Sequence, residues 1–392
     1  MTKDKREWWA FPWDYRESLF ISFAIILTGL LLDYIRLKTI SFLFPNNFIL
    51  LGILLVVIIL QSTKYRKSGL SKWLSSIQAS ITAILLFVVF SIVIALIPNG
   101  VQNNFIEGGI TRSWMYHFTS LYMFLVLGVI TCKKIINYKR KNIFFILSHL
   151  GLWIVLFFAS TSSYNISILQ MYVDEGNTVW YAYDKSGEKI DVPFAIKLNK
   201  FDIDEYIPKI AFVDNESGVL VEGTIKHLEQ GDSCQINGIP IKLKTFYKES
   251  VNYSGEYRHS NMPGAPASML VELMGNEKWI SCGSHLFPSK MSKINEQYSI
   301  VMLNPEPKRY YSEVTVYEKD GEVKDYTLEV NKPLSVKGWQ VYQKSYNKDM
   351  GRWSSLSVIE LVRDPYLWLV YIGCLLMVVG SFFLILKGKS NG

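Results

Sequence analysis

One histidine of this chain lies inside an apolar run that is long enough to enter a bilayer. His149 stands within residues 143–159 and follows a basic loop at 139–141. At a rise of 1.5 Å per residue, it would lie about 9 Å below the membrane edge of that run. Ionisable side chains at such a depth are costly and usually have a function. His149 is therefore the first candidate for chemistry.

The residues that share the helical face of His149 are aromatic and apolar. They lie within two turns of it: Phe145, Ile146, Leu152, Trp153 and Leu156. Neutral imidazole is a usual axial ligand of haem iron, and a flat apolar macrocycle suits such a wall, with Trp153 as one part of it. The other interpretation is a histidine that is hydrogen-bonded to a neighbouring helix. The residues by themselves leave both interpretations open.

The other histidines give weaker signals. His117 lies at the outer edge of another apolar run, where it is either part of an interfacial aromatic belt or a ligand near the external face. Three more are scattered along a long polar segment and form no HExxH motif: His227, His259 and His285. The sequence also lacks GxSxG, P-loop and GxGxxG motifs. These absences argue against a soluble hydrolase or a nucleotide-dependent enzyme.

Six apolar runs predict six transmembrane helices. They are residues 19–35, 48–60, 77–97, 118–132, 143–159 and 367–386, of which the second and fourth need flanking residues to span a bilayer. Lysine and arginine collect in the loops after the second and fourth runs and in the C-terminal tail, whereas residues 101–112 are nearly neutral. The positive-inside rule then places both termini in the cytoplasm. The net charge of +7 is explained by topology, and no nucleic-acid binding is inferred.

The polar segment at 162–365 has the pattern of an all-β domain. Side chains alternate along residues 194–200, 239–246 and 313–317, and Asn-Gly at 237–238 and Asp-Gly at 320–321 suit two-residue hairpins. We expect a sandwich or an open barrel outside the cytoplasm. The predicted organisation is a transmembrane hairpin with a basic loop at 1–75, a three-helix membrane core at 76–161, the β-domain at 162–365, and a final helix with a tail at 366–392.

Two of the four cysteines fall in the predicted external domain. Cys234 and Cys282 either form a disulfide, which would close a loop of about 48 residues and stabilise the fold by roughly 3–4 kcal/mol, or remain free thiols. The chain has no CxxC and no CxxCH motif. It therefore carries no thioredoxin-like motif and is not itself a covalent c-type cytochrome.

Two stretches resemble ResB/CcsB proteins of the system II cytochrome c maturation pathway. The first is SHLGLWIVLFFA at 148–159, and the second is VNKPLSVKGWQVYQKSY at 330–346, which continues through Asp364-Pro365 towards Gly373. PFAIKLNKF at 193–201 also resembles the first external strand of that family. The resemblance covers about residues 77–386, so the first two spans look like an added N-terminal hairpin.

This resemblance implies a subunit of a cytochrome c synthase in the bacterial inner membrane. Such a subunit pairs with a CcsA-type haem-handling membrane protein, shares a transient haem b with it, and presents the haem to apocytochrome c. His149 occupies the position of the family's membrane haem ligand. The chain would be a non-catalytic or half-site component of a haem lyase complex, with thiol-reducing proteins as further candidate partners. The alternative is a non-haem receptor or scaffold whose external β-domain binds a protein partner.

Overall fold

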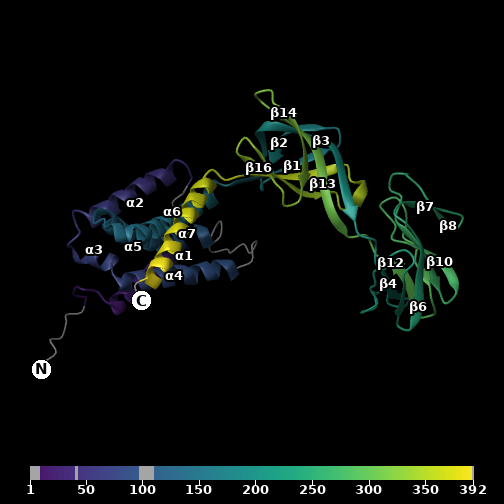
Figure 1. Cartoon of the computed structure of the whole chain (residues 1–392), viewed down its shortest axis with the longest axis horizontal. Helices are drawn as coiled ribbons and strands as arrows, with labels where there is room; N and C mark the ends of the chain where they lie inside the picture. The colour runs from purple at the N-terminus through teal and green to yellow at the C-terminus, as the bar shows by residue number, and fades with distance from the viewer. Residues whose placement is uncertain (1–8, 40–42, 97–109, 391–392) are drawn as a thin grey trace. The chain divides into compact units, whose positions relative to one another are not determined.

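The computed structural model describes residues 9–39, 43–96 and 110–390 (Figure 1). The predicted neutral loop at 101–112 therefore lies mostly outside the described residues, as does the extreme N-terminus. The chain divides into two compact units. Met1–Ile166 and Asp364–Gly392 make up the helical unit, and Ser167–Arg363 make up the β unit.

The helical unit is built from seven α-helices in its described part. They are α1 (Tyr15–Tyr34), α2 (Asn46–Ser62), α3 (Gly69–Leu74), α4 (Ile77–Leu96), α5 (Trp114–Ile136), α6 (Ile143–Asn165) and α7 (Leu367–Ser390). Among the described residues, five are long and apolar enough to cross a membrane, namely α1, α4, α5, α6 and α7. The 17-residue helix α2 is apolar but shorter, so the sixth span stays a prediction.

Helix α5 is the centre of the helical unit, because it contacts α1, α2, α4 and α6. Its first turn is fixed by Asp33 at the end of α1, whose Oδ1 accepts the backbone N–H of Trp114 at 2.8 Å. A carboxylate at that position satisfies an otherwise unpaired helix N–H and favours the positive end of the helix dipole. About two turns further along α5, Tyr122 shares a hydrogen bond of 2.9 Å with Thr82 of α4.

Helices α6 and α7 pack closely because small residues line their contact. A Cβ atom added to Gly151 of α6 would lie 2.5 Å from the backbone nitrogen of Met377 in α7. Ser148 and Ser381 join the same pair of helices through a hydrogen bond of 3.0 Å. Small side chains let two backbones approach, which is the usual basis of helix association in membranes.

The first part of the β unit is an eight-stranded, nearly closed, barrel-like sheet. Its strand order is β14-β13-β3-β2-β1-β17-β16-β15, and β14 contacts β16. Phe194, Ile196 and Leu198 of β3 point into its core, so the alternation predicted at 194–200 is present. The bounds are β1 Ser167–Asp174, β2 Thr178–Tyr183, β3 Lys189–Glu205, β13 Pro307–Glu318, β14 Val323–Glu329, β15 Leu334–Val336, β16 Trp339–Tyr346 and β17 Leu356–Arg363.

The second part of the β unit consists of smaller sheets around a separate core that includes Phe212, Ile241 and Met269. A four-stranded sheet has the order β10-β9-β6-β5, a three-stranded sheet has the order β11-β12-β4, and β7 pairs with β8. The bounds are β4 Ile210–Asp214, β5 Ser233–Ile236, β6 Ile239–Tyr247, β7 Ser250–Tyr253, β8 Glu256–His259, β9 Ser268–Leu273, β10 Asn276–Ser281, β11 Ser292–Lys293 and β12 Tyr298–Met302.

Only one of the two predicted hairpin turns has the expected form. Asn237 and Gly238 both have positive φ, 49° and 77°, between the paired residues Ile236 and Ile239, as a two-residue type I′ turn requires. The turn at Asp320 differs. There the N–H of Glu318 donates to the carbonyl of Glu322, and only Gly321 has positive φ. The loop thus has three residues with glycine at the left-handed position, which is the next most common hairpin type.

Candidate membrane binding site

The imidazole of His149 has one occupied and one open ring nitrogen. Its Nδ1 lies 2.9 Å from the backbone carbonyl oxygen of Phe145, one helical turn earlier. A carbonyl oxygen only accepts, so Nδ1 carries the proton and Nε2 keeps its lone pair. Within the part of the chain that the structure describes, Nε2 has no hydrogen-bond partner. The neutral tautomer with a free Nε2 is the form that binds a metal.

Phe145 also holds the ring of His149 in place. The two ring centroids are 3.7 Å apart at an interplanar angle of 23°, which is a stacked arrangement. One residue therefore fixes the imidazole twice, through its carbonyl and through its ring. A ligand that is held in this way loses little conformational freedom when it binds iron.

His149 lies on a face of α6 that differs from the face packed against α7. At 100° per residue, Ser148 and Gly151 point towards α7, whereas His149 points about 130° and Phe145 about 90° away from the centre of that contact. His149 is half-buried. This face is apolar and only partly covered within the helical unit, so a second macromolecule can reach it.

Trp153, which the sequence suggested as part of a haem pocket wall, packs between α5 and α6. Its exposed fraction is 7%, and its Nε1 donates to the carbonyl of Phe124 at 3.1 Å. Its ring is parallel to that of Phe157, with centroids 5.4 Å apart. The structure thus gives Trp153 a packing role between helices, and a contact between its ring and a ligand stays a prediction.

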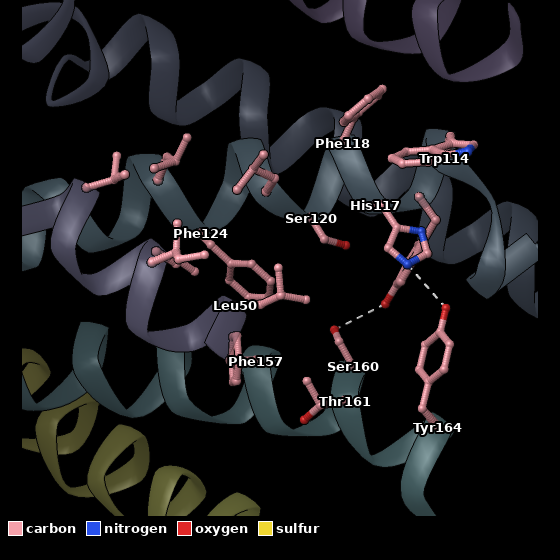
Figure 2. A pocket seen from close by; sticks show the side chains of 16 residues that line it. Leu50, Trp114, His117, Phe118, Ser120, Phe124, Phe157, Ser160, Thr161 and Tyr164 are labelled. Atoms are coloured by element: carbon pink, nitrogen blue, oxygen red, sulfur yellow. Dashed lines mark hydrogen bonds between the residues drawn. The ribbon is translucent and has the colours of Figure 1, made fainter. Parts of the chain in front are cut away.

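His117 lines a partly open cavity of about 360 Å³ between α2, α5 and α6 (Figure 2). Apolar side chains form most of its wall, and polar groups gather near the first turns of α5 and the last turns of α6. The lining residues are Leu50, Ile53, Leu54, Val57, Trp114, Tyr116, His117, Phe118, Ser120, Leu121, Phe124, Leu125, Phe157, Ser160, Thr161 and Tyr164.

Both ring nitrogens of His117 are occupied by hydrogen bonds. Nδ1 lies 2.5 Å from the carbonyl oxygen of Ser113, and Nε2 lies 3.2 Å from the hydroxyl of Tyr164 (Figure 2). By the same tautomer argument, Tyr164 donates to Nε2. Iron could reach His117 only after Tyr164 had moved away. The suggestion that His117 is a haem ligand therefore stays a prediction, and it has less geometric support than the one for His149.

The two membrane histidines cannot share one iron within this chain. Tyr164, the partner of His117, follows His149 by 15 residues on the same helix. That is about 22 Å along the helix axis. His149 therefore belongs to one end of the bundle and His117 to the other.

The disulfide suggested between Cys234 and Cys282 is absent, and both cysteines are free thiols. Cys234 is on β5 and Cys282 directly follows β10, and these are the two edge strands of the four-stranded sheet. Three strand spacings separate them by about 14 Å, whereas bridged cysteines have Cα atoms less than about 7 Å apart. Burial raises the pKa of the Cys282 thiol to about 11, so it is protonated and unreactive at neutral pH.

Sequence reasoning missed the polar groups that surround His117. Ser120 follows His117 by one helical turn, and this spacing could have placed the two residues on one side of α5. Ser160 and Tyr164 come from α6, and no local pattern connects them to His117. Their proximity arises from the packing of α5 against α6.

Comparison with known families gives one match. The model of the ResB-like family matches residues 291–359, and this match supports membership of the chain in the ResB/CcsB family. That family is associated with cytochrome c biogenesis. The matched region runs from β11 to β17 and lies entirely within the β unit. No curated protein matches the chain.

Proposed function

We propose that this chain is the haem-delivery subunit of a cytochrome c assembly complex of the system II type, and that His149 supplies one axial ligand to the haem iron. The family match provides the connection with cytochrome c biogenesis. The observation that carries the ligand assignment is the free Nε2 of His149 on an apolar, partly covered helix face. Neutral imidazole is a usual axial ligand of haem.

The surroundings of His149 fit a haem group. The hydrogen bond from Nδ1 to the Phe145 carbonyl fixes the tautomer and makes the imidazole a better donor to iron. Phe145, Leu152 and Leu156 offer an apolar surface to the macrocycle. No cationic side chain is needed at this depth, because the propionates of haem can lie towards the membrane surface, where Lys134 stands 5.7 Å from the Phe145 ring.

The open side of this face favours a site shared with a second subunit. One histidine per subunit would make haem binding depend on assembly, because neither subunit alone would provide both axial ligands. We propose that a CcsA-type membrane protein covers the face and supplies the second ligand. The haem is the cargo of the complex, and its vinyl groups form the thioether bonds with the cysteines of the apocytochrome.

The β unit would then position the apocytochrome outside the cytoplasm. This proposal places both termini in the cytoplasm and uses six spans, with α1 and α2 as an added transmembrane hairpin. Support for the topology comes from the basic loops of the sequence. Holding the two reactants near each other would supply much of the rate, and we assign no general acid or base to this chain.

The test is the haem content of the chain when it is purified with its partner. We expect a b-type absorbance spectrum, and we expect His149→Ala to lose most of it. His227→Ala is the matched control, because His227 is exposed in the β unit. An unchanged spectrum in His149→Ala would show that another residue binds the iron. A complex that never contains haem would favour the receptor or scaffold alternative.

A further inference from the structure

The cavity around His117 has a neutral lining. No lysine, arginine, aspartate or glutamate is among its lining residues. Arg112 lies over the Tyr164 ring at 5.3 Å but does not line the cavity. A phosphate or carboxylate inside this space would have no cation to pair with, and a buried charge without a partner is strongly disfavoured. The cavity therefore fits a ligand whose buried part is uncharged.

Ser120 presents an unused hydroxyl group to this cavity. The residue is 5% exposed, and its Oγ has no hydrogen-bond partner among the described residues. Figure 2 shows that the Ser120 side chain points into the space between α5 and α6. Buried polar groups are almost always hydrogen-bonded. An unpaired hydroxyl that lines a cavity indicates a ligand with a hydrogen-bond acceptor.

The other polar groups at this end are already paired with one another. The hydroxyl of Ser160 donates to the carbonyl of Leu156 at 2.7 Å, and it lies 3.2 Å from the hydroxyl of Tyr116. The hydroxyl of Tyr164 lies 3.2 Å from Nε2 of His117 and 3.4 Å from the carbonyl oxygen of Thr111. Ser120 therefore provides the hydroxyl donor that is left free for a ligand. The paired hydroxyls line the cavity but are not needed to bind the ligand. A ligand carbonyl oxygen is the group that best complements this arrangement.

The apolar part of the wall is suited to a ring and a chain. Phe124 and Phe157 present aromatic surfaces on opposite helices, 5.6 Å apart between centroids (Figure 2). Aromatic side chains pack well against planar rings. On α2, the lining residues Leu50, Ile53 and Val57 are all aliphatic and follow one helix face. They offer a track on which an apolar tail can lie.

We propose that this cavity binds a neutral p-quinone of the membrane-soluble, isoprenoid type. One ring carbonyl accepts the hydroxyl of Ser120, the ring lies against the aromatic side chains, and the tail follows α2. The proposal concerns binding only and does not depend on the haem assignment of His149. It also gives α2 a role, because this short helix supplies four of the residues that line the site.

The experiment measures the dissociation constant of decyl-p-benzoquinone for the full chain in detergent micelles. Quinones quench tryptophan fluorescence, and Trp114 lines the cavity. Micelles that contain free tryptophan provide the correction for partitioning. We expect saturable quenching, and we expect Ser120→Ala to weaken binding about five- to tenfold through the loss of one hydrogen bond.

Two pairs of variants make the result specific. Thr119→Ala is matched to Ser120→Ala, because Thr119 is also buried with an unpaired hydroxyl but does not line the cavity. Val57→Phe fills the α2 wall, whereas its neighbour Val56 is 56% exposed and lies outside the lining, so Val56→Phe is its control. We expect Val57→Phe to abolish saturable quenching and both controls to bind normally. Thermal unfolding of each variant identifies any that fails to fold.

Three outcomes would overturn the proposal. The first is an unchanged dissociation constant in both Ser120→Ala and Val57→Phe. The second is equal weakening by Ser120→Ala and Thr119→Ala. The third is a dissociation constant for decylbenzene as low as that for the quinone, because decylbenzene has the same alkyl chain but no carbonyl oxygens. That last result would identify the cavity as a site for a lipid acyl chain. This experiment does not measure haem. A negative result for quinone binding would therefore not affect the proposal that His149 binds iron.

Discussion

Phe145 stacks on His149 with ring centroids 3.7 Å apart, and its carbonyl oxygen accepts the Nδ1 proton of the same imidazole at 2.9 Å. The nitrogen that we propose as the iron ligand is thus held in a fixed orientation without any ligand. The two contacts can be separated by mutation, because the carbonyl belongs to the backbone and the stacking ring does not. Their separation leads to the first prediction.

Phe145→Leu should reduce haem retention by a few-fold, and less than the loss of His149 does. The leucine keeps the backbone carbonyl and therefore the tautomer, but it removes the stacked ring, which is worth about 1 kcal/mol. The measurement is b-type absorbance per complex. Phe144→Leu is the control, because Phe144 stacks on Phe383 of α7 at 4.8 Å. Equal losses in both variants would mean that general helix packing, and not the His149 ring, is responsible.

Gly151→Leu should destabilise the helical unit by about 1–3 kcal/mol. Any side chain at Gly151 meets the backbone of α7 at Met377, so α6 and α7 must separate. Gly52 in α2 is the matched control, because a Cβ there meets nothing within 4 Å. Unfolding in detergent followed by helical circular dichroism measures both variants. If Gly52→Leu were as damaging as Gly151→Leu, the contact between α6 and α7 would not be the cause.

Cys282 should react slowly with iodoacetamide at pH 8 and faster as the pH rises. Its thiol pKa is raised to about 11 by burial, so each pH unit below that value lowers the thiolate fraction about tenfold. Mass spectrometry of alkylated peptides after timed exposure gives the rate, and an unstructured cysteine peptide provides the reference. A disulfide-linked peptide that contains Cys234 and Cys282 from oxidised protein would contradict the strand order in this sheet.

Arg352→Gln should destabilise the β unit most above the pH at which Glu205 loses its proton. Arg352 pairs with Glu205 at 3.5 Å and with Glu249 at 3.3 Å, and all three side chains are largely buried. Burial raises the pKa of Glu205, and the positive charge of Arg352 opposes that rise. Without the arginine, the pKa of Glu205 in the folded protein rises further. The variant therefore loses stability at neutral pH, where Glu205 is charged, and regains it as the pH falls and the carboxyl becomes protonated. We expect a loss of about 1–3 kcal/mol at pH 7, because Glu205 is left without its partner at a site that is not fully buried.

The pH dependence of that loss can be measured by thermal unfolding of the full chain, followed by the β-sheet signal. Between pH 7 and pH 4 the melting temperatures of Arg352→Gln and the parent chain should converge. Lys344→Gln is the comparison, because Lys344 pairs with Glu360 at a more exposed site. A gap that stays constant with pH would mean that packing of the arginine, and not its charge, stabilises the unit.

The sequence predicted the helices and the β segment well where a single period extends over many residues. The runs at 77–97 and 143–159 correspond to α4 and α6, and the alternation at 194–200 lies within β3. The run at 48–60 is harder, because α2 has only 17 residues and length alone cannot separate a span from a buried helix. The prediction of a two-residue turn at Asp320 was wrong, because Asp-Gly is compatible with both two-residue and three-residue hairpin loops.

The candidate sites were less predictable because they depend on contacts between distant segments. His149 was visible, since one ionisable residue in an apolar run stands out. The hydroxyl of Tyr164 meets His117 only because α5 and α6 pack side by side, and nothing in either segment indicates this pair. The cysteines show the same limit, because strand order, which sequence spacing does not reveal, places Cys234 and Cys282 at opposite edges.

The most direct test of the proposed function is an imidazole titration of His149→Gly in complex with its partner. The glycine leaves a space at the position of the ring, and free imidazole can occupy it and supply the missing nitrogen. We predict that the variant loses the b-type spectrum and that imidazole restores it in a saturable manner, while His227→Gly behaves as the parent chain. A full haem spectrum in His149→Gly without imidazole would contradict the assignment of His149 as the iron ligand.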